Sequence, residues 1–102
     1  MPTESEAEQA LEMLRATAHD VYEVAKQARL KSHMLKHVEG YLVIASNQPV
    51  TIKKESARAQ ARWKEAAMED AEAHAQEQAL KERRDTSRIT ISLFQTMTKD
   101  RL

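Results

Sequence analysis

Lysine and arginine side chains are concentrated in the middle of this sequence. Residues 26–64 contain nine Lys and Arg against two Asp and Glu, whereas residues 1–25 contain one against six. The formal net charge of the 102-residue chain is zero, so the overall composition conceals this gradient. Cations gathered on neighbouring elements form an electrostatic footprint for phosphate groups. The middle of the chain is therefore the candidate nucleic-acid-binding region.

The candidate phosphate ligands are the long cationic side chains that surround one helix-breaking stretch. They are Arg29, Lys31, Lys36, Lys53, Lys54, Arg58 and Arg62. Two aromatic residues of the same region, Trp63 and Tyr41, would stack on unpaired bases if solvent reaches their rings. Two other interpretations stay open. The cations could form an ordinary solvated face, or basic and acidic regions of different copies could pair head to tail.

No residue pattern indicates catalysis or a cofactor. The chain has no Cys, which excludes a disulfide scaffold and a Cys-ligated zinc site. A Gly-rich phosphate loop and a Ser/His/Asp grouping are both missing from the sequence pattern. His33 and His37 could share a helix face, but a third metal ligand would have to come from another chain. We expect a protein that is not an enzyme and that holds no metal or cofactor.

The helix-breaking stretch is Ser46-Asn47-Gln48-Pro49-Val50-Thr51, which we call the corner. Pro49 lacks an N–H and disfavours the helical conformation in the residue before it. The segments on either side of the corner, residues 3–45 and 52–98, contain no proline and have helical composition. We predict an all-α domain over residues 1–102, with helices at about 3–45 and 52–98 forming an antiparallel, coiled-coil-like hairpin. A single Pro-kinked helix is the alternative.

The first helix is predicted to begin at Thr3, because Thr3 and Glu6 have the spacing of a capping box. Apolar residues recur at heptad spacing along it. The predicted seam is Ala7, Leu11, Leu14, Ala18, Val21, Ala25, Ala28, Ser32, Leu35, Glu39 and Leu42, widened by Ala10, Val24, Val38 and Ala45. Gly40 interrupts this helix; either another backbone approaches it closely or the helix ends near Glu39.

The second helix is predicted to be capped by Thr51 and has a weaker seam, made mostly of alanine. The run from Ile89 to Leu93 alternates like a strand, but an isolated strand has no pairing partner. We therefore favour helix there, with Ile89, Leu93 and Met97 on one face, and keep strand as the alternative. Strongly apolar positions facing alanine would leave a monomer with an exposed apolar stripe, which predicts a dimeric helical bundle.

No segment approaches the run of about 18 apolar residues that a membrane span requires. The polar and acidic start, Met1–Glu6, is unlike a secretory signal. We expect a cytoplasmic protein that does not contact the membrane.

Three segments resemble small helical proteins encoded by tailed phages and prophages. They are Ala28–Leu42; Lys54–Ala59 followed by Trp63; and Arg88-Ile89 followed by Phe94 and Thr96. The resemblance covers about residues 20–101. It implies a small accessory protein, associated with phage replication and recombination, and it supplies no catalytic residues.

The leading hypothesis is an oligomeric helical hairpin whose basic corner binds nucleic acid, in particular single-stranded DNA. The competing hypothesis is an adaptor or inhibitor that grips a host or phage enzyme through helix–helix contacts. A purely structural oligomer is the third.

Overall fold

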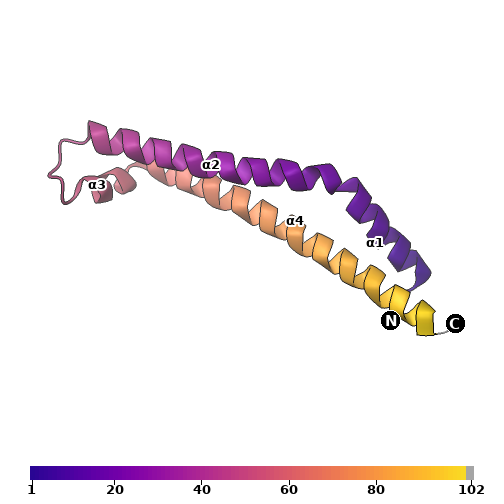
Figure 1. Ribbon diagram of the computed structural model, residues 1–102. Helices are drawn as coiled ribbons and strands as arrows, with labels where there is room; N and C mark the ends of the chain where they lie inside the picture. Colours follow the sequence, from indigo (N-terminus) through magenta and orange to yellow (C-terminus); the bar gives the residue numbers. More distant parts are fainter. Residues whose placement is uncertain (101–102) are drawn as a thin grey trace. The chain divides into compact units, whose positions relative to one another are not determined.

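The structure, a computed structural model, describes residues 1–100, and this part of the chain is helical without any strand (Figure 1). The helices within it are α1 (Glu4–Ala16), α2 (Ala18–Ala45), α3 (Lys53–Ala59) and α4 (Ala61–Asp100). None of these helices is both long enough and apolar enough to cross a bilayer. The all-α prediction is confirmed. The strand alternative at residues 89–93 is wrong, because α4 continues through that segment.

The chain divides into two compact units. Unit 1 combines Met1–Glu23 with the chain from Glu77 onward, and unit 2 is Val24–Gln76. Unit 1 therefore contains α1, the start of α2 and the second part of α4. Unit 2 contains the rest of α2, the corner, α3 and the first part of α4 (Figure 1). Every contact described below joins residues of the same unit.

The N-terminus of α1 follows the predicted cap. Thr3 is the N-cap, and its Oγ accepts the Glu6 N–H at 3.1 Å. The Glu6 carboxylate in turn accepts the Thr3 hydroxyl at 3.3 Å. Glu4 and Glu6 occupy the first turn, where negative charge suits the helix dipole.

The predicted first helix is interrupted at Thr17. This residue leaves the helical conformation, with φ −102° and ψ 4°, and its hydroxyl donates to the Met13 carbonyl at 2.7 Å. Such bonding to the i−4 carbonyl bends helices. Arg84 of α4 then donates Nη1 to the Leu14 carbonyl at 2.8 Å and to Thr17 Oγ at 2.6 Å. A partner distant in sequence therefore stabilises an interruption that the heptad pattern does not reveal.

The corner separates α2 from α3, but its capping differs from prediction. α2 continues through Gly40 to Ala45, so the early helix end near Glu39 is wrong. Ile52 N–H donates to the Pro49 carbonyl at 3.0 Å, which places Thr51 inside a turn. The N-cap of α3 is consequently Ile52, without a side-chain hydrogen bond, and the prediction that Thr51 caps this helix is wrong. The extended residue Gln60 then separates α3 from α4.

The core consists mainly of small residues. The buried apolar residues are Ala7, Ala10, Ala28, Val38, Ala57, Ala73 and Leu80. The residues of the first helix that face inward start at Ala7 and then follow at spacings of three and four residues. Ala10 is therefore buried, whereas Leu11 is 40% exposed. The predicted seam took the opposite order of steps, and its members Leu11, Ala18 and Val21 are exposed, as is Ala45 of the widening row, so these four assignments are wrong. Alanines bury little area each, so this core stabilises the fold weakly.

The apolar C-terminal part of α4 is rotated relative to the predicted face. Ile89 and Leu93 are 60% and 46% exposed, whereas Phe94 and Met97 are half-buried. Phe94 and Met97 share a hollow with Thr3 and Glu4 at the start of α1. Of the predicted face, only Met97 points inward.

Candidate nucleic-acid interface

All eight predicted site residues lie in unit 2, and those on α2 lie on two different flanks of that helix. Lys31 and Lys36 are five residues apart, which corresponds to about 140° around a helix. The flank that carries Lys36 is rich in cations without acidic partners. The flank that carries Lys31 has both positively and negatively charged side chains.

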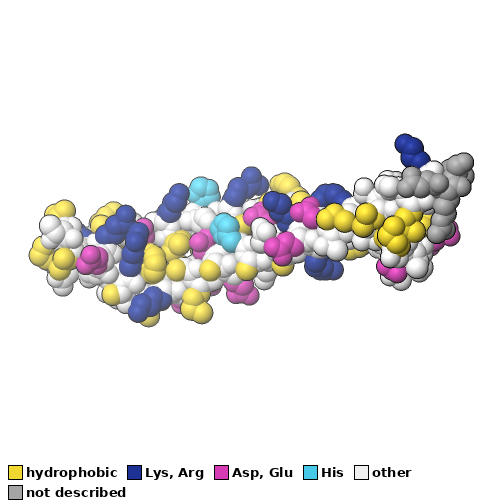
Figure 2. Space-filling model, turned by 90° about the horizontal axis from the view of Figure 1, so that it is seen from below, with side chains coloured by type: hydrophobic (Ala, Val, Ile, Leu, Met, Phe, Trp, Pro, Cys, Tyr) yellow, Lys and Arg dark blue, Asp and Glu magenta, His cyan; other side chains and the backbone are white. Residues whose placement is uncertain are grey.

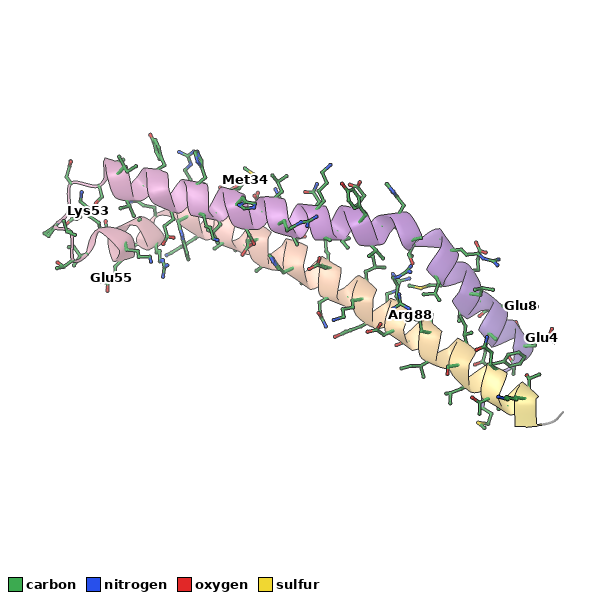
Figure 3. All side chains as sticks on the ribbon, viewed as in Figure 1. Glu4, Glu8, Met34, Lys53, Glu55 and Arg88 are labelled. Atoms are coloured by element: carbon green, nitrogen blue, oxygen red, sulfur yellow. The ribbon has the colours of Figure 1, made fainter. Side chains whose placement is uncertain are left out.

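Three lysines from two elements converge on the first flank. Lys36 of α2 and Lys53 and Lys54 of α3 line one hollow of about 370 Å³. Gly40, Val43 and Val50 form its apolar part. Lys53, half-buried, stands at the start of α3 beside the corner (Figure 3). The corner thus brings together cations that are 17 residues apart in sequence.

Arg29 extends this flank along α2, because it lies seven residues, or about two turns, before Lys36. We call Arg29, Lys36, Lys53 and Lys54 the lysine face. Within residues 1–100, none of these four side chains takes part in an ion pair. Glu39 also borders the hollow, but its carboxylate is held by Arg58 Nε at 2.6 Å.

On the other flank, positive and negative side chains alternate. Lys31 and Arg62 share a hollow with Glu65 and Glu69, and Lys31 Nζ lies 3.4 Å from Glu69 Oε2. Nearby carboxylates lower the local positive potential. The structure therefore does not bring Lys31 and Arg62 together with the lysine face.

The two predicted stacking rings differ in accessibility, and each is covered by a guanidinium group. Arg58 lies over the Trp63 ring at 5.6 Å, and Arg62 over the Tyr41 ring at 5.2 Å. Trp63 is half-buried, and its indole N–H is buried without a hydrogen-bond partner in the described part of the chain. Tyr41 is 56% exposed. Tyr41 is consequently the ring that a base could reach more readily.

Figure 2 shows how the side chains of different types are distributed on one face of the molecule. Over unit 2, Lys and Arg side chains stand among exposed hydrophobic and His side chains. Much of the exposed hydrophobic surface of unit 2 belongs to α2. Leu30, Met34, Tyr41 and Ile44 are 45%, 47%, 56% and 84% exposed.

The structure also assembles a polar group that the sequence pattern did not indicate. Ser32 Oγ donates to Asp70 Oδ1 at 2.6 Å, and His74 Nδ1 lies 3.3 Å from the same carboxylate oxygen. His74 Nε2 is 3.5 Å from Ser32 Oγ. In a catalytic triad the serine donates to histidine at about 2.6–3.2 Å. Here the serine proton is directed at the carboxylate, which is the geometry of a structural hydrogen bond between α2 and α4.

The described residues contain no cluster of three or more His, Asp or Glu side chains that could hold a metal ion. His33 and His37 are both exposed on α2. In this part of the chain they therefore lack the third ligand that a metal site requires.

Comparison with protein-family models, with curated proteins and with solved structures finds no match for this chain. Its function is therefore inferred from the side chains and their geometry.

Proposed function

We propose that this protein is a non-enzymatic nucleic-acid-binding protein whose lysine face holds the phosphates. The observation that carries the proposal is the convergence of Lys36, Lys53 and Lys54 on one hollow. Cationic side chains that border a common hollow favour the binding of a phosphate group there. The one carboxylate that borders the hollow, Glu39, is already paired with Arg58.

The ligand is a single strand, by this proposal, and DNA is the form we favour. Tyr41 is 56% exposed and carries Arg62 over its ring at 5.2 Å, and base stacking on aromatic rings contributes about 1–3 kcal/mol per base. The resemblance to small phage proteins supports a place beside replication or recombination enzymes, in the host cytoplasm. Arg58 and Arg62 then contribute by holding Glu39 and Tyr41 in position.

Fluorescence anisotropy with a labelled single-stranded oligonucleotide tests the proposal. Each phosphate contact contributes about 0.7 to the slope of log affinity against log salt concentration. Lys53→Ala/Lys54→Ala should weaken binding at least tenfold and reduce that slope by about 1.4. The matched control is Lys81→Ala/Arg83→Ala, which removes two positive charges from exposed positions in unit 1. Equal affinity of the two variants, or no binding by the wild type at low salt, would refute the proposal.

A second candidate role, self-association, is favoured by the exposed residues of α2. Leu30, Met34, His37, Tyr41 and Ile44 recur at steps of four and three, the spacing of a coiled-coil seam. We call these five residues the outer row. Of the flanking residues, Val38, Gly40 and Ala45 are uncharged, and the charge of Lys31 is paired with Glu69 at 3.4 Å. As the alternative to base stacking on Tyr41, we infer that a second copy of this chain covers the outer row and forms the predicted dimer.

Such a dimer should be weak, because four large side chains supply less than the roughly 800 Å² per partner of a standard interface. We also infer that units 1 and 2 are successive parts of one antiparallel hairpin, since α2 and α4 each contribute to both. Sedimentation velocity tests the dimer with Ile44→Glu. Val50→Glu is the matched control, because Val50 is 85% exposed and Ile44 84%. Loss of association in both variants, or in neither, would contradict an interface at the outer row.

A further inference from the structure

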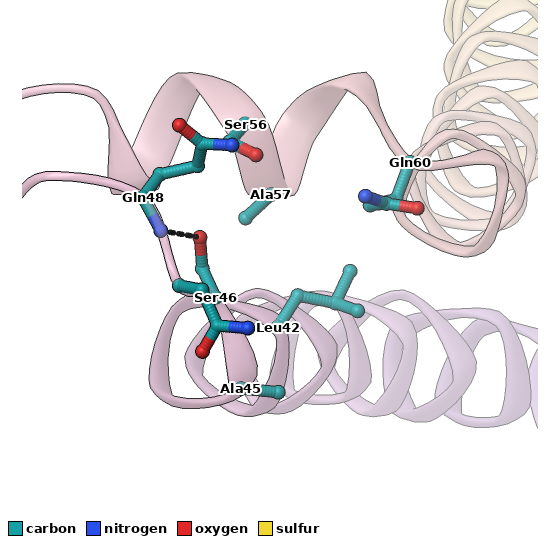
Figure 4. Close-up of a pocket in the computed structure, with 8 residues that line it drawn as sticks. Leu42, Ala45, Ser46, Gln48, Ser56, Ala57 and Gln60 are labelled. Atoms are coloured by element: carbon teal, nitrogen blue, oxygen red, sulfur yellow. Dashed lines mark hydrogen bonds between the residues drawn. The ribbon is translucent and has the colours of Figure 1, made fainter.

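A second hollow lies at the corner, and its lining is chemically different from that of the lysine face. It has a volume of about 390 Å³ and is bordered by the end of α2, the corner, α3 and Gln60 (Figure 4). Leu42, Ala45 and Ala57 supply apolar surface. All the other lining residues are Ser, Asn or Gln, and no Lys, Arg, Asp or Glu borders the hollow.

The polar groups that line this hollow are neutral amides and hydroxyls. Figure 4 shows the side chains of Gln48 and Ser56 near each other, with Gln60 farther along the chain after α3. The Gln48 backbone N–H donates to Ser46 Oγ at 3.2 Å, which fixes the direction of the corner at this point. Among the described residues, the amide groups of Gln48 and Gln60 have no hydrogen-bond partner in the protein. Each of these groups can both donate and accept.

This combination matches the chemistry of a nucleobase. A base has apolar faces and an edge of alternating donors and acceptors, and Asn or Gln amides are the side chains that pair with such edges. A volume of about 390 Å³ lies within the range of small-molecule pockets. A hollow lined by charged groups would favour a phosphate or a carboxylate instead.

The hollow also lies beside the phosphate-binding residues. Lys53, Ser56 and Ala57 have the i, i+3, i+4 spacing of one helix face of α3. Lys53 borders the lysine hollow, whereas Ser56 and Ala57 border the neutral one. The residues of α3 that border the two hollows are therefore about one helical turn apart along the helix.

Resting on the proposed function, we infer that the neutral hollow takes one unpaired nucleobase from a strand whose phosphates lie on Lys36, Lys53 and Lys54. A base within a duplex is stacked and paired, and extracting it costs a few kcal/mol. The hollow thus makes the corner selective for single strands. It also adds a preference for base-bearing strands that charge alone cannot give.

The test uses the full chain and two labelled 12-nucleotide strands of equal charge. One strand carries bases and the other carries abasic sites throughout. The wild type should bind the base-bearing strand about tenfold more tightly, the discrimination expected of amide–base hydrogen bonds. Gln48→Ala/Gln60→Ala should remove that preference and leave the affinity for the abasic strand and its salt slope unchanged. The matched control, Gln27→Ala, alters an exposed glutamine of α2 and should keep the preference.

The outcomes separate the two proposals. Equal affinity of the wild type for both strands would overturn the base site while leaving phosphate binding intact. A preference that survives Gln48→Ala/Gln60→Ala would also overturn it and assign base recognition elsewhere. No binding of either strand at low salt would overturn the proposed function and the base site together.

Discussion

Replacing Arg84 by Gln should destabilise unit 1 more than replacing any other Lys or Arg residue of that unit. Arg84 Nη1 donates to the Leu14 carbonyl and to Thr17 Oγ, at 2.8 and 2.6 Å. Both bonds join α4 to the point where α1 ends and α2 begins. The shorter glutamine side chain cannot reach both acceptors.

The size of the effect follows from these two contacts. A hydrogen bond from a charged donor contributes about 1.5–3 kcal/mol, and less where solvent competes. Arg84 and Thr17 are half-buried, so both bonds are partly screened. We expect Arg84→Gln to lower the free energy of unfolding by about 2–3 kcal/mol. For a chain of this size that corresponds to a fall in Tm on the order of 10–20 °C.

Thermal unfolding followed by circular dichroism measures the change, and hydrogen exchange localises it. Amides of α1 should exchange faster in Arg84→Gln, whereas those of α3 should not change. Arg83→Gln is the matched control, since Arg83 is the adjacent residue, is exposed, and makes no ion pair within residues 1–100. If the two variants unfold at the same temperature, Arg84 does not stabilise the interruption at Thr17.

Three further predictions concern unit 2. Gly40→Ala should raise stability by about 1 kcal/mol, because nothing lies within 4 Å of the added Cβ; a loss of self-association in sedimentation experiments would instead indicate that another chain's backbone packs there. Ser32→Ala should cost about 1–2 kcal/mol in urea unfolding, because Asp70 loses a 2.6 Å donor; a double-mutant cycle with Asp70→Asn should show coupling, and purely additive effects would argue against the bond. Ile44→Glu should leave helicity unchanged while abolishing dimers at micromolar concentration.

The boundaries that depend on local chemistry were predictable from the sequence. Pro49 and its polar neighbours ended α2, and Thr3 capped α1, because both effects act within a few residues. The interruption at Thr17 was not predictable in this way. Thr86, Thr90, Thr96 and Thr98 all donate their hydroxyls to the i−4 carbonyl, yet α4 continues through each of them. Thr17 differs because Arg84 also binds there.

The sequence predicted which region of the chain contains the candidate site, but not how the side chains of the site are arranged. Clustering of Lys and Arg in the sequence identified residues 26–64, since charge density needs no knowledge of geometry. Which cations converge depends on the rotation of α2, because neighbouring residues differ by about 100° around a helix. The pairing of Arg58 with Glu39 and the mixed hollow of Lys31 likewise depend on contacts between helices. The amide-lined hollow arises from the path of the corner itself, which residue types alone do not determine.

The alanine-rich core has a consequence for how the helices find their alignment. Ala28, Ala57 and Ala73 resemble one another so closely that helices sliding by one heptad would meet almost the same apolar surface. The polar contacts remove this degeneracy, because Ser32 finds an acceptor at Asp70 and Arg84 finds Thr17 only in one alignment. Polar residues within a seam are known to specify register at some cost in stability. Each pair therefore fixes the alignment of the helices within its own unit.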